Sequence, residues 1–117
     1  MITLRHRLPT PPWQRDDNGD MRILSQEEIS PLLADHPEWT GGAEHLTRVF
    51  TAGDFAAAIA VVNKVAAIAE DMNHHPDIDL RWATLRFRVS THSAGGVTDL
   101  DLELARRIES VLAAETA

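Results

Sequence analysis

The feature that most constrains the fold is a long apolar stripe that starts after Asp54 and stops just before two adjacent histidines. Its members recur with the ~3.6-residue period of an amphipathic helix: Phe55, Ala58, Ile59, Val62, Val65, Ala66, Ala69 and Met72. Asp54 is a suitable N-cap, and Pro76 disfavours helical geometry for the residue before it, so the helix should end near Asn73 or His74. Other apolar residues lie off the stripe. We therefore expect this helix to be covered on more than one side, by the protein's own core or also by a partner subunit.

Two alternating runs follow the helix, and alternation is the pattern of half-buried β-strands. The apolar positions of the two runs are Ile78, Leu80 and Trp82, then Leu85, Phe87 and Val89. The phase slips by one residue at Ala83-Thr84, which indicates two strands joined by a short turn. Before the long helix, residues 45–51 predict another strand, and we expect the stretch at Trp39 to pair with it across a Gly-Gly turn.

Capping motifs mark two further helices. Ser25 and Glu28 form a capping box, so a helix should run from there towards Ala34, although Pro31 would break it or begin a second helix. A similar box, Thr98 with Asp101, precedes the last helix. The order helix, two strands, helix, two strands, helix predicts an α+β fold with two layers, a four-stranded antiparallel sheet with helices on one face.

Composition limits the classes of protein that remain. At 117 residues the chain fits one domain, which we divide into a flexible amino-terminal extension (1–20, rich in Arg, Pro and Asp) and a folded domain (21–117). With no Cys, disulfides, thiolate zinc sites and a Cys nucleophile are excluded. The net charge of −7 opposes contact with nucleic-acid phosphates. No signal-peptide pattern opens the chain, and no apolar run approaches the ~20 residues that span a bilayer. We expect a cytoplasmic protein that binds neither nucleic acid nor membrane.

The strongest chemical signal is the pair His74 and His75. A carboxylate lies four residues before each one, with Glu70 on the helix face of His74 and Asp71 pointing the same way as His75. In the predicted sheet the end of the last strand approaches the same edge, which would bring His92 near the pair. Three imidazoles with carboxylates nearby can remove and deliver protons close to neutral pH. This pattern favours an acid–base site.

Two other interpretations stay open on spacing alone. The histidines are also suitable metal ligands, with Glu70 or Asp101 to complete the set, although adjacent histidines rarely bind one ion together. Alternatively their role is structural, with His74 capping the helix and His92 hydrogen-bonding within its loop.

Three motifs in combination carry a family resemblance. They are Glu70-x3-His74-His75-Pro76, Ser90-Thr91-His92 at a strand end, and Gly96-x-Thr98 before a helix with Asp101. Together they resemble the pterin-4a-carbinolamine dehydratases, over residues 24–113. The resemblance implies two β-β-α units that form an antiparallel sheet with helices on one side, and assembly into a homodimer or homotetramer.

The resemblance also implies an activity. The family dehydrates 4a-hydroxytetrahydropterin to quinonoid dihydropterin and water, a step of tetrahydrobiopterin recycling, by acid–base catalysis without metal or organic cofactor. The residues at its catalytic positions are His74, His75, His92 and Glu70. The residues at its pterin-binding positions are Asn73, Ser90, Thr91, Ser93 and Asp101. By this likeness His74 and His92 transfer protons, while His75 orients the substrate or shares that work.

The resemblance is also compatible with a second class of function. Some members of the family act as dimerisation partners of a transcription factor, so a non-catalytic binding module is the alternative to an enzyme, and a histidine metal-binding protein ranks behind both. Two positions depart from the family pattern: Ile78 stands where some relatives have an aromatic residue, and Asn73 where others have an acidic one.

Overall fold

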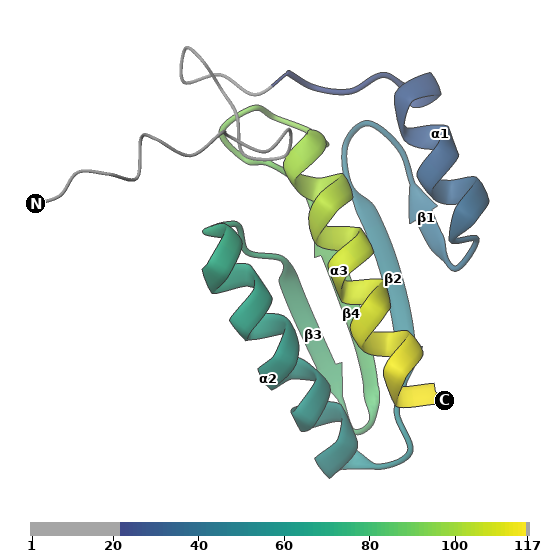
Figure 1. Cartoon of the computed structure of the whole chain (residues 1–117), viewed down its shortest axis with the longest axis vertical. Helices are drawn as coiled ribbons and strands as arrows, with labels where there is room; N and C mark the ends of the chain where they lie inside the picture. Colours follow the sequence, from purple (N-terminus) through teal and green to yellow (C-terminus); the bar gives the residue numbers. More distant parts are fainter. Residues whose placement is uncertain (1–21, 117) are drawn as a thin grey trace, which may run out of the picture.

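The computed structural model describes residues 22–116, so the predicted extension at 1–20 lies outside the described residues. In chain order the elements are α1 (Gln26–Asp35), β1 (Trp39–Gly41), β2 (Leu46–Thr51), α2 (Phe55–Met72), β3 (Asp77–Arg81), β4 (Thr84–Val89) and α3 (Asp99–Thr116). The strands form one antiparallel sheet in the order β1-β2-β4-β3. The helices lie on one face of this sheet (Figure 1). The predicted α+β class and the order of elements are confirmed.

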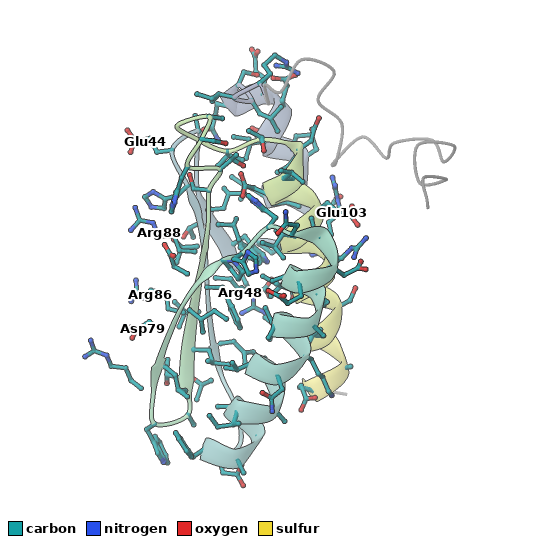
Figure 2. The ribbon with its side chains drawn as sticks, turned by 90° about the vertical axis from the view of Figure 1, so that its left-hand side faces the viewer. Glu44, Arg48, Asp79, Arg86, Arg88 and Glu103 are labelled. Carbon is teal, nitrogen blue, oxygen red and sulfur yellow. The ribbon has the colours of Figure 1, made fainter. Side chains whose placement is uncertain are left out.

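The core lies between the sheet and the two long helices. Its central residues are Val61 and Val65 on α2, Leu85, Phe87 and Val89 on β4, and Leu104, Ile108 and Leu112 on α3. No helix of residues 22–116 covers the opposite face of the sheet, here called the uncovered face, and Asp79, Arg86 and Arg88 point away from the helices on it (Figure 2). In the described chain, no helix combines the length and the apolar character that crossing a membrane requires.

The buried face of α2 agrees with the predicted stripe at Ala58, Val65, Ala69 and Met72, but it includes Val61 and leaves out Phe55 and Ile59. The buried positions are Ala58, Val61, Val65, Ala69 and Met72. Phe55 and Ile59, which the stripe placed in the core, are 52% and 36% exposed. Helical period alone does not decide which of two adjacent apolar stripes faces inward. Because α2 packs against the sheet and α3 on one side only, the second stripe remains at the surface.

α1 is one continuous helix with Pro31 inside it, so neither predicted effect of this proline occurs. The capping box is present: the Glu28 backbone N–H donates to Ser25 Oγ, and the Ser25 N–H donates to a Glu28 carboxylate oxygen. Pro31 removes one helical N–H donor. Burial of Ile29 and Leu32 on either side of the proline keeps the helix against the core.

The β3–β4 turn consists of Trp82 and Ala83, and it displaces Trp82 from its predicted strand position. Leu80 and Leu85 are paired across the hairpin, which fixes a two-residue connection between the strands. Trp82 therefore lies in the turn with a φ of 55° and is 74% exposed. Ala83 is buried, and its carbonyl accepts the backbone N–H of Ala52.

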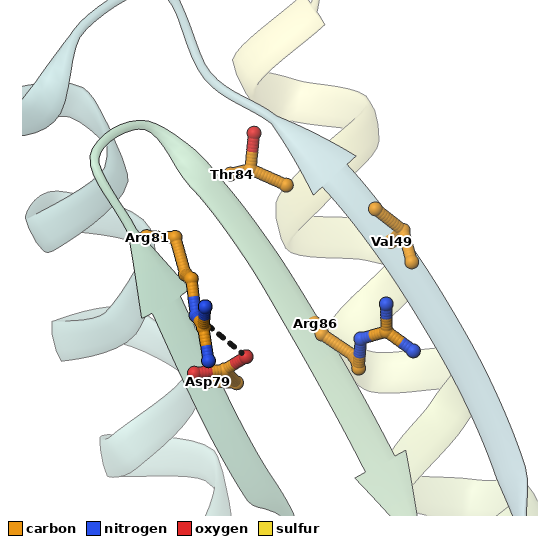
Figure 3. A pocket seen from close by; sticks show the side chains of 5 residues that line it. All are labelled: Val49, Asp79, Arg81, Thr84 and Arg86. Carbon is orange, nitrogen blue, oxygen red and sulfur yellow. Dashed lines mark ion pairs between the residues drawn. The ribbon is translucent and has the colours of Figure 1, made fainter.

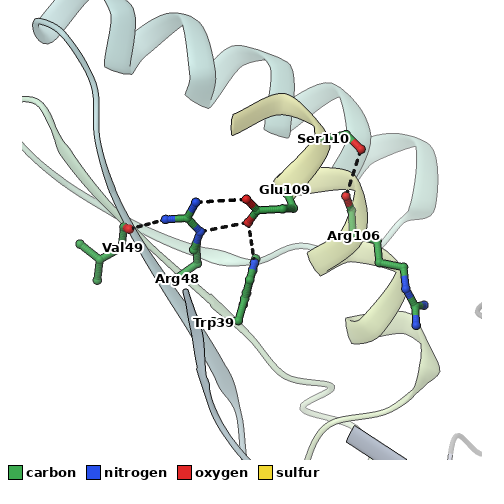
Figure 4. Close-up of polar contacts among 6 residues, drawn as sticks. All are labelled: Trp39, Arg48, Val49, Arg106, Glu109 and Ser110. Carbon is green, nitrogen blue, oxygen red and sulfur yellow. Dashed lines mark hydrogen bonds and ion pairs between the residues drawn. The ribbon is translucent and has the colours of Figure 1, made fainter. Parts of the chain in front are cut away.

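A polar cluster joins α3 to β1 and β2 (Figure 4). One carboxylate oxygen of Glu109 accepts hydrogen bonds from Trp39 Nε1 at 2.8 Å and Arg48 Nε at 3.0 Å. The second oxygen accepts from the Arg48 guanidinium at 3.1 Å. Burial raises the pKa of the Glu109 carboxyl, but the hydrogen bonds from Arg48 and Trp39 lower it, and the resulting pKa lies below the usual 4.5. The ionised carboxylate is therefore the form that stabilises the fold.

We predict that Glu109→Gln lowers the free energy of unfolding at pH 7 by about 2 kcal/mol, because it weakens hydrogen bonds to a charged group. A carboxyl whose pKa is depressed by folding stabilises the protein above its unfolded-state pKa, and this contribution is lost as pH falls through the folded-state pKa. The difference between wild type and variant should therefore hold from pH 7 to about 4.5 and shrink below that. Urea unfolding across this range measures it.

Glu115→Gln is the matched control on the same helix, since Glu115 pairs with Lys64 at the surface. Its effect should stay within about 0.5 kcal/mol. A Glu109→Gln effect that did not change with acidification would contradict our assignment.

Candidate active site

One open cleft, of about 340 Å³, lies where α2 ends and β4 gives way to the next loop. Its lining residues are Asn73, His74, His75, Pro76, Asp77, Ser90, Thr91, His92 and Ser93. These two segments meet because β3 and β4 pair as a hairpin, so the start of β3 and the end of β4 are at the same end of the sheet (Figure 1). The cleft thus brings together the three predicted histidines and four of the five predicted pterin-binding residues.

The end of α2 fixes where the histidine pair begins. Asn73 adopts the left-handed conformation, with φ 52° and ψ 43°. Its N–H donates to the carbonyl of Glu70 at 3.2 Å, and the N–H of His74 donates to that of Ala69 at 3.0 Å. This is the Schellman arrangement, which satisfies the last carbonyls of the helix and reverses the direction of the chain. The helix ends where the sequence predicted.

His74 is held by a buried carboxylate. Its Nε2 lies 2.6 Å from Oδ1 of Asp101, and the two side chains are 11% and 0% exposed. Because a carboxylate accepts hydrogen bonds, Nε2 is the protonated nitrogen, and Nδ1 is free to accept a proton in the neutral ring. The hydrogen bond to the Asp101 carboxylate thus fixes the orientation of the His74 ring.

Asp101 does not line the cleft, although the resemblance placed it at the pterin site. Its Oδ2 accepts the Thr91 hydroxyl at 2.7 Å and the Thr98 backbone N–H at 2.9 Å. The two threonine hydroxyls are in turn 2.7 Å apart. The Thr98–Asp101 box recognised in the sequence already directs this carboxylate back to the start of α3. The box accounts for the contact with Thr98, whereas the contact with His74 joins residues far apart in the sequence and depends on the packing of α3 against the end of α2.

Glu70 contacts His75 and not His74. Its carboxylate lies 2.6 Å from Nε2 of His75, and both side chains are exposed. The left-handed residue Asn73 takes His74 off the helix face and turns it towards α3, so the four-residue spacing no longer applies past the helix end. Asp71 instead pairs with Arg107 at 3.0 Å, a contact that the sequence did not indicate.

A tight loop presents His92. The carbonyl of Thr91 accepts the N–H groups of Ala94 and Gly95, and the N–H of Thr91 donates to the carbonyl of Gly96. The hydroxyl of Ser90 donates to the carbonyl of Glu44 at 2.8 Å. His92 and Ser93 are exposed on this loop and line the cleft. The backbone is therefore fixed, while the imidazole of His92 faces solvent and any bound molecule.

A second groove, of about 460 Å³, lies on the uncovered face of the sheet (Figure 3). It is lined by Val49, Asp79, Arg81, Thr84 and Arg86. Although this groove is larger, it contains no imidazole, and its arginines do not exchange protons near neutral pH. The smaller cleft is therefore the candidate active site. Within residues 22–116, no set of three His, Asp or Glu side chains is arranged to hold a metal ion.

Comparison with known sequences agrees with the resemblance. The family described as Pterin 4 alpha carbinolamine dehydratase matches residues 22–111. A protein of Nocardia farcinica is 49% identical over 89 residues, which cover 76% of this chain and 94% of that protein. One from Chloroflexus aurantiacus is 43% identical over 92 residues, covering 79% and 99%. Both have the provisional name pterin-4-alpha-carbinolamine dehydratase, a hydro-lyase activity.

Two solved structures are also similar. The transcriptional coactivator/pterin dehydratase from Brucella melitensis superposes with a TM-score of 0.73 at 29% identity, covering 78% of this chain and 99% of that one. A pterin dehydratase-like protein, identified as a RuBisCO assembly factor in the alpha-carboxysome, gives a TM-score of 0.54 at 19% identity over 63% and 86% of the two chains. The second likeness is one of fold alone.

We predict that Asn73→Ala lowers the free energy of unfolding by about 1 kcal/mol, because an alanine Cβ disfavours the left-handed conformation. Asn73→Gly should stay within about 0.5 kcal/mol of wild type, since glycine adopts this conformation without a steric penalty. Urea unfolding of the two variants measures the difference. Equal stability of the alanine and glycine variants would show that the left-handed end of α2 is not required.

Proposed function

Because the chain belongs to the pterin 4 alpha carbinolamine dehydratase family, we propose that its cleft dehydrates a 4a-hydroxytetrahydropterin to quinonoid dihydropterin and water. The observation that supports this most is the joint placement of His74, His75 and His92, from two separate segments, in one cleft. The recycling of tetrahydrobiopterin is the process that such a reaction would serve.

The reaction needs one proton removed and one delivered. The bond between C4a and the hydroxyl oxygen breaks, and that oxygen takes a proton and leaves as water. N5 loses its proton, and the electrons of the N–H bond form the new C4a=N5 double bond. No oxidant or reductant takes part, so two side chains that exchange protons near neutral pH are sufficient. We accordingly propose that the protein uses neither metal nor organic cofactor.

We assign removal of the N5 proton to His74. Its Nδ1 is the nitrogen left free by the hydrogen bond from Nε2 to Asp101. When Nδ1 takes a proton, the ring becomes an imidazolium, and the carboxylate of Asp101 stabilises that charge from behind. Asp101 thus acts through His74 as a positioning residue and does not touch the substrate.

We assign proton delivery to His92, which faces the cleft from the opposite segment. His75, paired with Glu70, orients the substrate or shares in proton transfer. Asn73, Ser90 and Ser93 offer hydrogen-bonding groups to a flat heterocycle along the same lining. The hydroxyl of Thr91 is already bonded to Asp101, so its contribution is to hold the site together.

We predict that His92→Ala lowers kcat for carbinolamine dehydration by roughly 100-fold or more, the usual contribution of a general acid or base. The measurement is the rate of carbinolamine breakdown with and without protein. His36→Ala, which changes a histidine outside the cleft, is the matched control and should retain full activity. A His92→Ala protein as active as wild type would contradict the assignment of His92.

In the same assay, Asp101→Asn tests whether Asp101 orients the ring of His74 or only stabilises the fold. An amide facing Nε2 favours the wrong ring tautomer, so kcat should fall and its pH profile should shift, while the KM for the pterin changes little. A variant that loses stability but keeps the wild-type pH profile would show that Asp101 is structural only.

We also propose that the protein forms a homodimer or homotetramer through the exposed apolar residues of α2. Phe55 and Ile59 lie one turn apart at its surface, and exposed apolar patches mark interaction sites. Light scattering at micromolar concentration should give a multiple of the 13.0 kDa chain mass, and Ile59→Asp should shift the population towards monomer. A monomeric wild type would contradict this.

A second candidate function is protein binding without catalysis. The same apolar residues of α2 favour it, and the similar Brucella protein is described as both coactivator and dehydratase. If purified protein does not accelerate carbinolamine breakdown but retains one stable partner in a pull-down, the binding function replaces the enzymatic one.

A further inference from the structure

One carboxylate lines the cleft and two more are bonded to its histidines, while no Lys or Arg is among the lining residues. Asp77 lines it directly and is exposed. Glu70 lies behind His75, and Asp101 lies behind His74. We propose, on the basis of the function assigned above, that the cleft selects pterins with uncharged substituents against those with anionic ones, and that Asp77 is the residue that sets this selectivity.

The histidines do not cancel this negative charge. A proton on His74 or His75 would be balanced by the carboxylate already bonded to that ring, Asp101 or Glu70 respectively. Of the three histidines, only His92 has no bonded carboxylate in the described chain and could offset Asp77. The negative charge of Asp77 is therefore not balanced by either of the carboxylate-bonded histidines.

Arg88 is the nearest cation to Asp77 by strand register, since the two are partners across β3 and β4. Its guanidinium contacts Nδ1 of His45 at 3.3 Å instead. In the part of the chain that the structure describes, Asp77 forms no ion pair. Its field is thus available to a molecule in the cleft.

The size of the cleft sets the strength of the effect. A cube of 340 Å³ has an edge of about 7 Å, which is within the Debye length of about 10 Å at 0.1 M salt. An anionic substituent on a bound pterin would therefore feel Asp77 with little screening. At about 7 Å and an effective dielectric constant of about 40 to 80, removing one repulsive charge changes affinity roughly threefold to sevenfold.

The test uses two pterins with the same ring, 6-hydroxymethylpterin and pterin-6-carboxylate, at neutral pH and low salt. Fluorescence titration gives the Kd of each, and their ratio measures selectivity. Wild type should bind the neutral pterin more tightly than the carboxylate. Asp77→Asn should reduce the ratio roughly threefold to sevenfold, mainly by tightening binding of the carboxylate, and added salt should reduce the wild-type ratio in the same direction.

Asp79→Asn is the matched control. Asp79 is two residues further along the same strand, is also exposed, and lines the groove on the uncovered face instead of the cleft. It should leave the ratio unchanged. Equal binding of the two pterins by wild type, or an unchanged ratio in Asp77→Asn, would overturn this inference while leaving the dehydratase function intact. Failure to bind either pterin would also overturn this inference, and the rate of carbinolamine breakdown would then decide separately about the dehydratase function.

Discussion

The site depends on one buried carboxylate. Asp101 accepts hydrogen bonds from His74, Thr91 and the backbone of Thr98. These partners belong to the chain after α2, the chain after β4 and the start of α3, so one side chain joins the three segments that form and support the cleft. Without it, His74 and the loop of Thr91 would lose the carboxylate that ties both of them to the start of α3.

Burying a carboxylate is unfavourable unless hydrogen bonds replace the lost water. Asp101 meets this condition because both of its oxygens are bonded and because it lies in the first turn of α3, where the helix dipole favours negative charge. The stabilisation depends on each donor being in place, which fixes the ring of His74 together with the loop of Thr91. The interactions that make this buried charge tolerable are thus the ones that orient a proton-transferring group.

The sequence predicted those parts of the structure that rest on local rules. The capping boxes, the alternation of β3 and β4 and the proline after the histidine pair were sufficient for the class and order of elements. The predictions from local rules were wrong where the backbone conformation of one or two residues changes the direction of the chain. The left-handed Asn73 gave Glu70 a different histidine partner, and the two-residue turn moved Trp82 to the surface. The choice between two apolar stripes on α2 depended on the packing of α3, which no local pattern contains.

The distance between the two halves of the cleft is set at the far end of the hairpin. Pairing of Leu80 with Leu85 keeps both on the core side and leaves two residues for the turn. The same register places Asp77 opposite Arg88, so the residues just before β3 and just after β4 become neighbours. A slip of one residue would shift the strands by about 3.4 Å and turn their apolar side chains to the solvent face. The burial of Leu85 and the partial burial of Leu80 therefore fix the register that lets His74 and His92 act on one molecule.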